Sequence, residues 1–446
     1  MTKHRASVKD ILRVLFVYDE GTRINLFDSF PWLASFFRKR IYFALLRSFS
    51  DVVFTILIFW GLFGPQDRYN PVLFISWGIW WTSIVLSWFF VGRMWCAFCP
   101  FPGIGRILQH FSLSLKKRPP RLLDRYCTYI ATLFFAFIIW AEAVFHLKYS
   151  PLGTSLLLLS ILTGATFFAL IYKGQAWCRY FCPMGKIIGS AATMSLLEFR
   201  PDLEKCRGCK TFACKRGKDA LHGCPVYLGA FNVRNNLLCL DCGHCLILCE
   251  NNSPAFYLRH PLRELIINKG RHLTCTYIIP FLMASQLSRF VQEKCSCYQT
   301  WKAYFGHSEA LTFSLVLGAW FVFFMLLIRL GTRLFNFWED ELFGRFSPMV
   351  PVMVPLAFTG ELIYRLEYFL RHLGEFLNYF GLGRVNISPL GLKILSLLLL
   401  LCGFAGSIYV AYIFYAKEFK GAVSFKNFLA ILVLIIMVEA LYLYYS

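Results

Sequence analysis

Apolar runs of about 20 residues recur along the chain and are separated by polar or basic stretches. This is the length that an α-helix needs to cross the hydrocarbon core of a bilayer. The fifth run is the least apolar, because it contains Pro280, Gln286 and Arg289. The pattern predicts an all-α polytopic membrane protein with about nine transmembrane helices, near residues 41–63, 72–92, 127–147, 152–173, 273–291, 310–330, 348–370, 387–416 and 425–445.

The first 40 residues carry two further patterns. The apolar residues of Val8–Tyr18 recur with helical spacing, which predicts an amphipathic helix. An aromatic stretch, Phe27–Phe37, follows and ends in Arg38-Lys39-Arg40. Together these patterns favour a segment that lies on the inner leaflet of the membrane. The first apolar run, Val14–Val17, is too short to indicate a cleavable signal peptide.

Composition and charge agree with a polytopic membrane protein. The chain is 57% hydrophobic and carries a net charge of +21, which by itself could also indicate nucleic-acid binding. If residue 1 is cytoplasmic, however, the inside segments hold 35 Lys and Arg and the outside segments hold six. Leaving out the long segment 173–272 still gives 20 against six, and short basic loops face the cytoplasm. We therefore expect a multi-pass protein of the inner (cytoplasmic) membrane that contacts lipid and no nucleic acid.

The long inside segment carries the strongest chemical signal. Eight cysteines fall between Cys206 and Cys249. The second half reads Cys-x₂-Cys-x₂-Cys-x₃-Cys, the spacing that surrounds a cubic iron–sulfur cluster. The first half begins with Cys-x₂-Cys and ends in Cys224-Pro225, but its middle gaps are expanded. The segment is therefore predicted to be an inserted, cytoplasmic, ferredoxin-like domain.

In two-cluster ferredoxins the fourth cysteine of each run binds the other cluster. We accordingly assign the eight cysteines to two [4Fe–4S] clusters. The first is expected to be held by Cys206, Cys209, Cys214 and Cys249, and the second by Cys239, Cys242, Cys245 and Cys224. A structural zinc site is the alternative, because paired Cys-x₂-Cys motifs also bind zinc. The Cys-Pro step and the closely spaced second run favour clusters.

A near-repeat precedes this segment. The second helix ends in Gly-Arg-Met-Trp-Cys96-Ala-Phe-Cys99-Pro, and the fourth ends in Gly-Gln-Ala-Trp-Cys178-Arg-Tyr-Phe-Cys182-Pro. The proline after each second cysteine ends the helix and fixes the turn. Two related hairpins would bring the four thiols to one membrane face, beside the ferredoxin-like segment. They could bind a third cluster or another metal, or form two redox-active pairs; inert interfacial cysteines are the plain alternative.

With these motifs, residues 41–260 resemble the membrane-bound polyferredoxins of the NapH, NosR and CcoG type. Those proteins pair helical hairpins ending in Cys-x₃-Cys-Pro with a cytoplasmic two-cluster module. The stretch from Cys224 to Cys245 is especially similar to the members that act in cytochrome-oxidase assembly. Two features differ: the first turn has Cys-x₂-Cys-Pro, and the run around Cys214 is expanded. The resemblance implies electron transfer between membrane quinol and clusters, sometimes in the service of a copper enzyme.

Two smaller candidates lie outside these motifs. Arg47 and Asp51 share one face of the first helix and are a candidate quinone or proton site, because charges inside a span often mark a function. Cys295 and Cys297 lie in an outside loop, where they could bind a soft metal such as Cu(I) or form a disulfide.

The last four helices have no counterpart in the resemblance. The seventh carries Glu361, Arg365, Glu367 and Arg371, which predict two i,i+4 ion pairs. His372 and His146 are expected at outer helix ends. Two such histidines could ligate a haem, although hydrogen-bonded surface histidines are the simpler interpretation.

These patterns predict four parts: an interfacial segment (1–40), a four-helix membrane domain (41–200), the ferredoxin-like domain (201–260) and a C-terminal membrane domain (261–446). The expected function is electron transfer between the quinone pool and redox partners, which would be other membrane or periplasmic respiratory subunits. A quinol dehydrogenase activity follows if quinol is the donor. The alternative is an assembly factor that keeps copper or thiols reduced for a respiratory metalloenzyme. A docking role for the last four helices is a third possibility.

Overall fold

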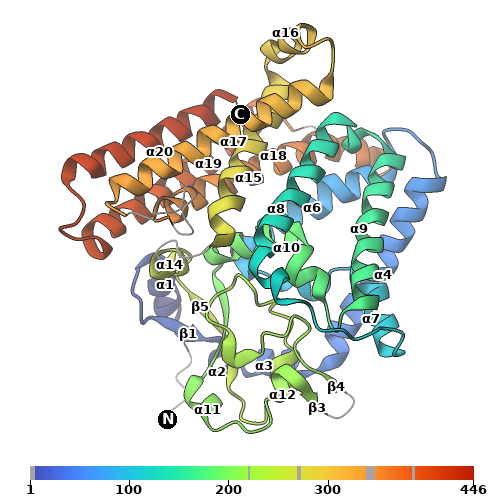
Figure 1. Cartoon of the computed structure of the whole chain (residues 1–446), viewed down its shortest axis with the longest axis vertical. Coiled ribbons are helices and arrows are strands. Elements are labelled where there is room, and N and C mark those ends of the chain that lie inside the picture. The colour runs from blue at the N-terminus through green and yellow to red at the C-terminus, as the bar shows by residue number, and fades with distance from the viewer. Residues whose placement is uncertain (1–5, 219–220, 269–272, 338–346, 384–386, 446) are drawn as a thin grey trace. The chain divides into compact units, whose positions relative to one another are not determined.

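A computed structural model describes residues 6–218, 221–268, 273–337, 347–383 and 387–445 and is mostly helical (Figure 1). Among these residues, eight spans are long and apolar enough to cross a membrane. They are α4 (Arg40–Phe63), the run α5–η1–α6 (Pro71–Leu73, Phe74–Trp80 and Trp81–Val91), α8 (Arg121–Val144), α9 (Pro151–Ile171), α17 (Glu309–Leu334), α18 (Met349–Tyr379), α19 with η7 (Pro389–Ile413 and Phe414–Glu418) and α20 (Phe425–Tyr445).

The fifth of the nine expected spans is not among these eight. Its residues do form a continuous helix, α15 (Leu273–Lys294), but this helix is too polar to qualify as a span. Gln286 and Arg289 lie fully buried, and α15 packs against α17 and α18. Protein therefore surrounds most of α15, so its sequence does not need the apolar composition of a lipid-facing helix.

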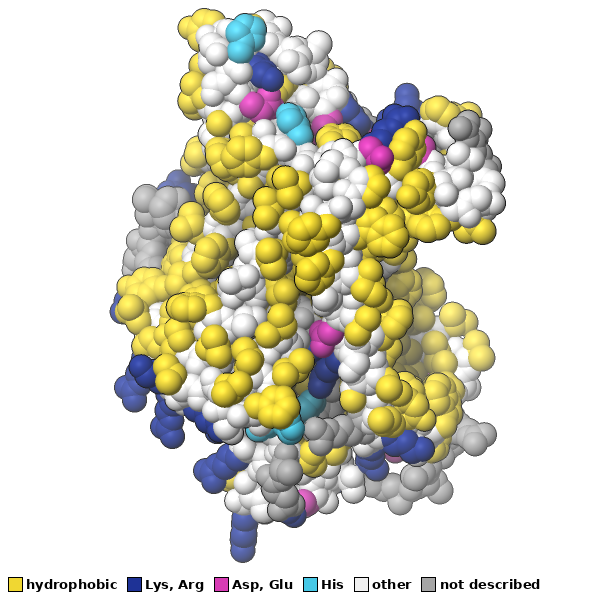
Figure 2. Space-filling view, turned by 90° about the vertical axis from the view of Figure 1, so that its right-hand side faces the viewer, with side chains coloured by type: hydrophobic (Ala, Val, Ile, Leu, Met, Phe, Trp, Pro, Cys, Tyr) yellow, Lys and Arg dark blue, Asp and Glu magenta, His cyan; other side chains and the backbone are white. Residues whose placement is uncertain are grey.

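Hydrophobic side chains cover much of the surface in Figure 2. On α4, for example, Phe49 and Phe63 are 71% and 80% exposed. An exposed apolar surface of this extent would be unstable in water and fits lipid. The fold is therefore that of a multi-pass membrane protein.

The chain divides into two compact units. Unit 1 comprises Met1–Phe59, Ser87–Ala131 and Leu156–Glu264, and unit 2 comprises Trp60–Leu86, Thr132–Ser155 and Leu265–Ser446. The four parts expected from the sequence group these segments differently, because residues 41–200 contribute to both units. Shorter helices of unit 1 are α1 (Val8–Phe16), α7 (Gly103–His110), α10 (Pro183–Ala191), η5 (Ala192–Met194) and η6 (Ala230–Asn232). η3 (Leu147–Tyr149) and α16 (Ser296–Tyr304) belong to unit 2, and α14 (Arg263–Asn268) begins in unit 1.

A small antiparallel sheet organises unit 1. Its central strand is β5 (Pro254–Arg259), which pairs with β2 (Leu197–Pro201) on one side and with β1 (Arg23–Asn25) on the other. The cysteine-rich segment between β2 and β5 contains only short elements. Among its described residues these are α11 (Leu203–Arg207), α12 (Ala213–Arg216), the hairpin β3–β4 (Gly217–Lys218 and Leu221–His222), η6 and α13 (His244–Leu248).

The N-terminal segment packs on this sheet. After β1 come α2 (Leu26–Ser29) and α3 (Pro31–Arg38), and the rings of Phe27 and Phe37 lie 5.9 and 4.7 Å from that of Phe256. Phe256 is fully buried and faces Phe199 across the β2–β5 pair. Several aromatic residues that suggest an interfacial segment in the sequence thus belong to the core of unit 1, although Trp32 stays exposed.

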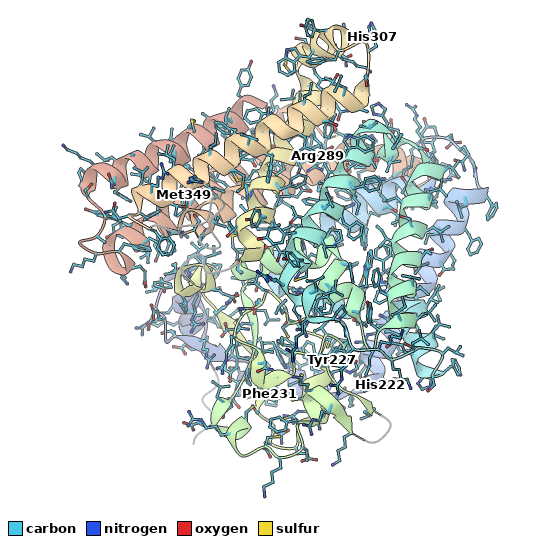
Figure 3. The ribbon with its side chains drawn as sticks, in the orientation of Figure 1. His222, Tyr227, Phe231, Arg289, His307 and Met349 are labelled. Atoms are coloured by element: carbon cyan, nitrogen blue, oxygen red, sulfur yellow. A yellow bond between two sulfur atoms is a disulfide. The ribbon has the colours of Figure 1, made fainter. Side chains whose placement is uncertain are left out.

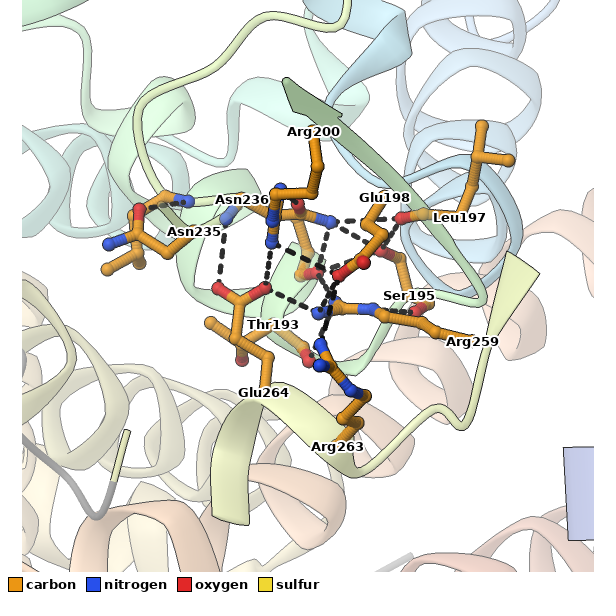
Figure 4. A network of polar contacts seen from close by, with 12 residues as sticks. Thr193, Ser195, Leu197, Glu198, Arg200, Asn235, Asn236, Arg259, Arg263 and Glu264 are labelled. Carbon is orange, nitrogen blue, oxygen red and sulfur yellow. Dashed lines mark hydrogen bonds and ion pairs between the residues drawn. The ribbon is translucent and has the colours of Figure 1, made fainter. Parts of the chain in front are cut away.

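A buried ion-pair network reinforces the sheet (Figure 4). Arg259 Nη1 lies 2.6 Å from Glu264 Oε2 and 3.3 Å from Glu198 Oε2. Arg200 contacts both carboxylates, and Arg263 contacts Glu198. Burial alone would raise the pKa of Glu198, but the surrounding arginines outweigh it and hold that pKa below its ordinary value. The charges are paired, which is the condition for burying them.

We expect Glu264→Gln to destabilise unit 1. Glu264 accepts hydrogen bonds from Arg200, Arg259 and the backbone N–H of Asn236, so the substitution leaves two buried guanidinium groups undercompensated. Breaking one side of a buried ion pair costs about 3–5 kcal/mol. Thermal unfolding in detergent measures the effect, and exposed Glu204→Gln is the matched control. Equal melting temperatures for the two variants would contradict the structural role of the network.

Candidate functional site

The first expected group of cysteines comes together in unit 1. Burial and the neighbouring thiols of Cys249, Cys214 and Cys209 raise the pKa of Cys206, which places all four side chains near one another. Ser253 supports two of them: its Oγ lies 3.1 Å from Cys206 Sγ, and its backbone N–H donates to Cys249 Sγ at 3.4 Å. The sequence pattern did not single out Ser253, because serine has no part in the cysteine spacing.

The second group surrounds a small, mostly apolar cavity. Its wall includes the four cysteines together with Phe199, Val233 and Leu240. Burial first, and then the nearby thiol of Cys224, raises the pKa of Cys242 to about 11. These positions are those that the spacing assigns to one cluster: Cys224, Cys239, Cys242 and Cys245.

The two groups adjoin. The backbone N–H of Cys224 donates to Cys214 O at 3.0 Å, and Cys245 Sγ lies 3.9 Å from the same oxygen. Helices α12 and α13, which carry Cys214 and Cys245, pack together. The crossed assignment, in which each run supplies a cysteine to the other group, is therefore geometrically reasonable.

Zinc is the alternative metal for these cysteine groups. Four zinc ligands must place their sulfurs about 2.3 Å from one common point. Within the described part of the chain, no three Cys, His, Asp or Glu side chains are arranged closely enough to hold a single ion. The Cys-x₂-Cys-x₂-Cys-x₃-Cys spacing therefore remains the reason for favouring clusters.

The two Cys-Pro turns form a third group. Cys96 lies in η2 (Met94–Ala97), Cys178 lies in η4 (Trp177–Phe181), and Cys182 caps α10 by accepting from the N–H of Gly185 at 3.3 Å. Burial and then the thiols of Cys178, Cys96 and Cys182 raise the pKa of Cys99. The hairpin repeat thus brings the four cysteines into one neighbourhood of unit 1.

A glycine begins each turn. Gly92 and Gly174 both have a left-handed backbone, with φ of +60° and +66°. A Cβ on Gly174 would lie 2.7 Å from both Pro225 O and the ring of Tyr227, residues that follow Cys224 (Tyr227 is labelled in Figure 3). Glycine is the residue that tolerates both this conformation and such close contact. The turn can therefore pack directly against the loop of the second group.

Arg93 joins the third group to the second. Its side chain is 2% exposed and donates to Leu237 O, and its backbone N–H donates to Asp241 Oδ2 at 3.3 Å. Asp241 lies between Cys239 and Cys242, and burial raises its pKa to about 6. Arg93 also lowers the pKa of Cys178, against the larger effect of burial. The only sequence signal for Arg93 is its place in the first turn, so the sequence does not indicate its contacts with the second group.

Other cations lie near the third group. Arg106 donates to Cys99 O at 3.4 Å, and Lys186 Nζ lies 3.4 Å from Cys127 Sγ. Lys186 is nearly inaccessible, and burial lowers its pKa. Positive groups in a buried site favour bound negative charge, which ligating thiolates would supply.

The structure gives the candidate pair Arg47 and Asp51 different partners. Arg47 Nε donates to Ala97 O at 2.7 Å, between the cysteines of the first turn, and its Nη1 lies 3.3 Å from His244 Nε2. Asp51 forms an ion pair with Arg106 at 3.1 Å. Both residues therefore contact the surroundings of the first Cys-Pro turn, and Arg106 is an addition that the sequence did not suggest.

The candidate residues that the sequence places on the outer side of the membrane lie in unit 2. Cys295 and Cys297 are joined in a disulfide, so in this state they are not the metal ligands that the sequence allowed. The two expected ion pairs of α18, Glu361–Arg365 and Glu367–Arg371, are both present. The imidazole of His372 lies within hydrogen-bond distance of Tyr368 O, as expected for a histidine bonded at the surface.

Known proteins show similarity to part of this chain. The 4Fe-4S binding domain family matches residues 73–119 and 154–189, which contain the two Cys-Pro turns. Uncharacterized protein MJ0749 of Methanocaldococcus jannaschii is 25% identical over 181 residues, which is 39% of this chain and 68% of that protein. The putative electron transport protein YccM of Escherichia coli is 24% identical over 212 residues, 42% of this chain and 55% of YccM.

Uncharacterized protein MJ0750 of M. jannaschii is 21% identical over 235 residues, 48% of this chain and 90% of that protein. No solved structure matches the chain. The family match and the similarity to YccM support an iron–sulfur protein of electron transfer. The family match also covers the four cysteines that the sequence could not assign to one cofactor.

We expect Cys96→Ser and Cys178→Ser to have the same effect, because their thiols belong to one group. If the two turns hold a third four-iron cluster, each substitution should lower the iron content from about twelve to about eight atoms per chain. Iron and acid-labile sulfide determination measures the change. Cys127→Ser is the control, since Cys127 lies nearby but outside the three groups. Different results for the two turn variants would instead indicate two separate dithiol pairs.

Proposed function

We propose that this chain is a membrane-bound electron-transfer protein with three iron–sulfur clusters. Two are held by the cysteines between Cys206 and Cys249, and the third is held by the two Cys-Pro turns. The observation that carries the proposal is the grouping of twelve thiols into three adjoining sets within unit 1. When bound, iron–sulfur clusters accept and release single electrons.

Residues of the protein favour cluster binding at these sites in two ways. Burial raises the pKa of Cys99 and Cys239, so these thiols would become thiolates only beside a strong positive charge such as iron. Arg93 and Arg47 connect the turns to the loop of Cys239–Cys245 through hydrogen bonds. These contacts hold the second and third groups a short distance apart, as efficient electron transfer between clusters requires.

We propose that membrane quinol is the electron donor. The same arrangement would also allow electrons to pass in the reverse direction, from the clusters to quinone. Oxidation of a quinol releases two protons as well as two electrons, so a proton acceptor is needed near the first acceptor of electrons. Asp51 suits this role, because it pairs with Arg106, which itself bonds to Cys99 O. A Cβ on Gly103 would lie 2.5 Å from Asp51 Oδ1, so the carboxylate lies directly against the turn.

The uneven distribution of Lys and Arg favours a cytoplasmic location for the cysteine-rich segment. Partners would then be other redox subunits of the membrane or the periplasm. Such partners follow from the proposed chemistry, because a carrier of single electrons needs both a donor and an acceptor protein or pool.

A maturation factor is the second candidate. The disulfide of Cys295 and Cys297 supports it, because both residues are only partly buried and could exchange with thiols of a client protein. Affinity capture of the full chain separates the two functions. Stoichiometric capture of redox subunits supports electron transfer, whereas transient capture of an immature copper enzyme supports maturation.

The proposal is tested by adding a quinol analogue to anaerobic, purified full-length protein. Low-temperature electron paramagnetic resonance then follows the clusters. We expect the signals of reduced clusters to appear, and reoxidation on addition of a quinone analogue. Clusters that are present by iron analysis but never respond to either analogue would rule out the quinone pool as the partner.

Asp51→Asn should slow this reduction while leaving the iron content unchanged. A positioned base typically contributes 10²–10⁴-fold, so we expect a loss of about a hundredfold or more in rate. Stopped-flow absorbance of the clusters measures the rate, with exposed Asp28→Asn as the control. The role of Asp51 is contradicted if the clusters of Asp51→Asn are reduced as fast as those of the control variant at every pH.

A further inference from the structure

Unit 2 contains a polar cavity of about 1710 Å³ that takes no part in the iron–sulfur sites. Its walls come from α8, α15, α16, α18 and α19, and they include charged, tyrosine and histidine side chains. One wall residue, Glu142 of α8, is only 3% exposed. A charged residue at the end of a membrane-spanning helix, buried yet bordering a polar cavity, suggests exchange with the aqueous contents of that cavity.

Glu142 belongs to a buried quartet with Glu361 of α18 and two arginines, Arg289 of α15 and Arg365 of α18. Figure 3 labels Arg289 on its helix. The two positive and two negative charges balance. The quartet is therefore electrically neutral when both carboxyl groups are ionised, which limits the cost of burying it.

The two carboxylates are bound unequally. Glu361 Oε2 accepts from Arg289 Nη2 at 2.9 Å, and Glu361 Oε1 accepts from Arg365 Nε at 2.8 Å. A third donor, Gln286 Nε2, lies 3.3 Å from Glu361 Oε2. Charge-assisted bonds of this kind strongly favour the ionised form. Glu361 is therefore the permanently negative member of the quartet.

Glu142 has no comparable bonds. Its oxygens lie 3.5 Å from Arg365 Nη1 and 4.0 Å from Arg289 Nη1, and neither oxygen has a hydrogen-bond partner among the described residues. Arg289 Nη1 and Arg365 Nη2 are also without hydrogen-bond partners there. These unpaired donors and acceptors can instead bond to water that enters from the cavity. Acceptors and donors that face one gap make the site suitable for water.

Aromatic rings hold the two arginines in place. The guanidinium carbon of Arg289 lies 4.1 Å from the ring centre of Tyr364, and that of Arg365 lies 4.4 Å from the ring centre of Trp81. Cation–π contacts of this kind restrict the guanidinium planes. The arginines are thus unable to close the gap to Glu142 without losing their contacts with Glu361 and the rings.

We propose that Glu142 is a proton-exchange site, which takes up and releases a proton through water in the cavity of unit 2. The charged and titratable groups around it are Arg289 on α15, Glu361, Tyr364, Arg365 and Tyr368 on α18, and His146 in the turn that follows α8. Protonation of Glu142 leaves one uncompensated positive charge, and the adjoining polar cavity provides the solvation that this charge requires. The site is independent of the iron–sulfur clusters.

Mapping with dicyclohexylcarbodiimide tests the proposal on the unaltered full chain. This apolar reagent adds to protonated carboxyl groups in membrane proteins, and peptide mass analysis identifies each modified residue. We expect labelling of Glu142 to decrease as the pH is raised, because the reagent requires the protonated acid. Glu361 should remain unlabelled throughout. Labelling of Glu361 as fast as Glu142, or no pH-dependent labelling of Glu142, would overturn the proposal.

Infrared difference spectroscopy provides a second readout. Titration of the full chain should show a pH-dependent carbonyl band of a protonated carboxylic acid, which shifts in D₂O because water reaches the group. The band should be lost in Glu142→Gln and kept in Glu375→Gln, a variant at another wall residue of the cavity. Unchanged cluster absorbance would show that both variants are folded. The same band in Glu142→Gln would assign the titration to another residue and reject the proposal.

Discussion

The backbone of a membrane-spanning segment must satisfy its hydrogen bonds within the segment, because lipid offers no partners. This constraint decides where turns of irregular backbone, such as the two Cys-Pro turns, can lie. The cysteine turns begin only after α6 ends at Val91 and after α9 ends at Ile171. Irregular backbone there is stabilised by protein instead of lipid: the N–H of Gln175 donates to Pro225 O, and Arg179 donates to Val226 O. The hairpin repeat and the cysteine-rich segment therefore depend on each other.

The electrostatics of unit 1 follow from the same arrangement. Arg93 and Lys186 are deeply buried, and an isolated buried cation is costly. Both line a small cavity together with Cys178, whose ligating form is negative. A bound cluster with four thiolates would therefore stabilise these cations as well as be stabilised by them, which links cofactor binding to the folding of the surrounding turns.

Much of this arrangement could be predicted from the sequence, but only where the chemistry fixes local spacing. The cysteine spacing predicted the two groups of four, and the repeat predicted that the turns approach each other. Contacts between distant segments leave no such pattern. Nothing near Phe27 or Phe37 indicates that they pack on Phe256, and the aromatic stretch reads equally well as a lipid-facing segment. Likewise, the polarity of α15 indicated a weak span without showing that Arg289 has buried partners on two other helices.

The order of strands in the sheet has a consequence for biosynthesis. β5 lies between β1 and β2, so β1 can pair with it only after β5 has been made. Roughly 230 residues separate these strands, and at ribosomal rates of about 5–20 residues per second this takes on the order of 10–50 s. During that interval four spans enter the membrane and all twelve cysteines emerge before the sheet can close. The nascent chain thus passes through a stage in which all twelve cysteines have been made but the sheet that frames the cysteine-rich segment is not yet complete.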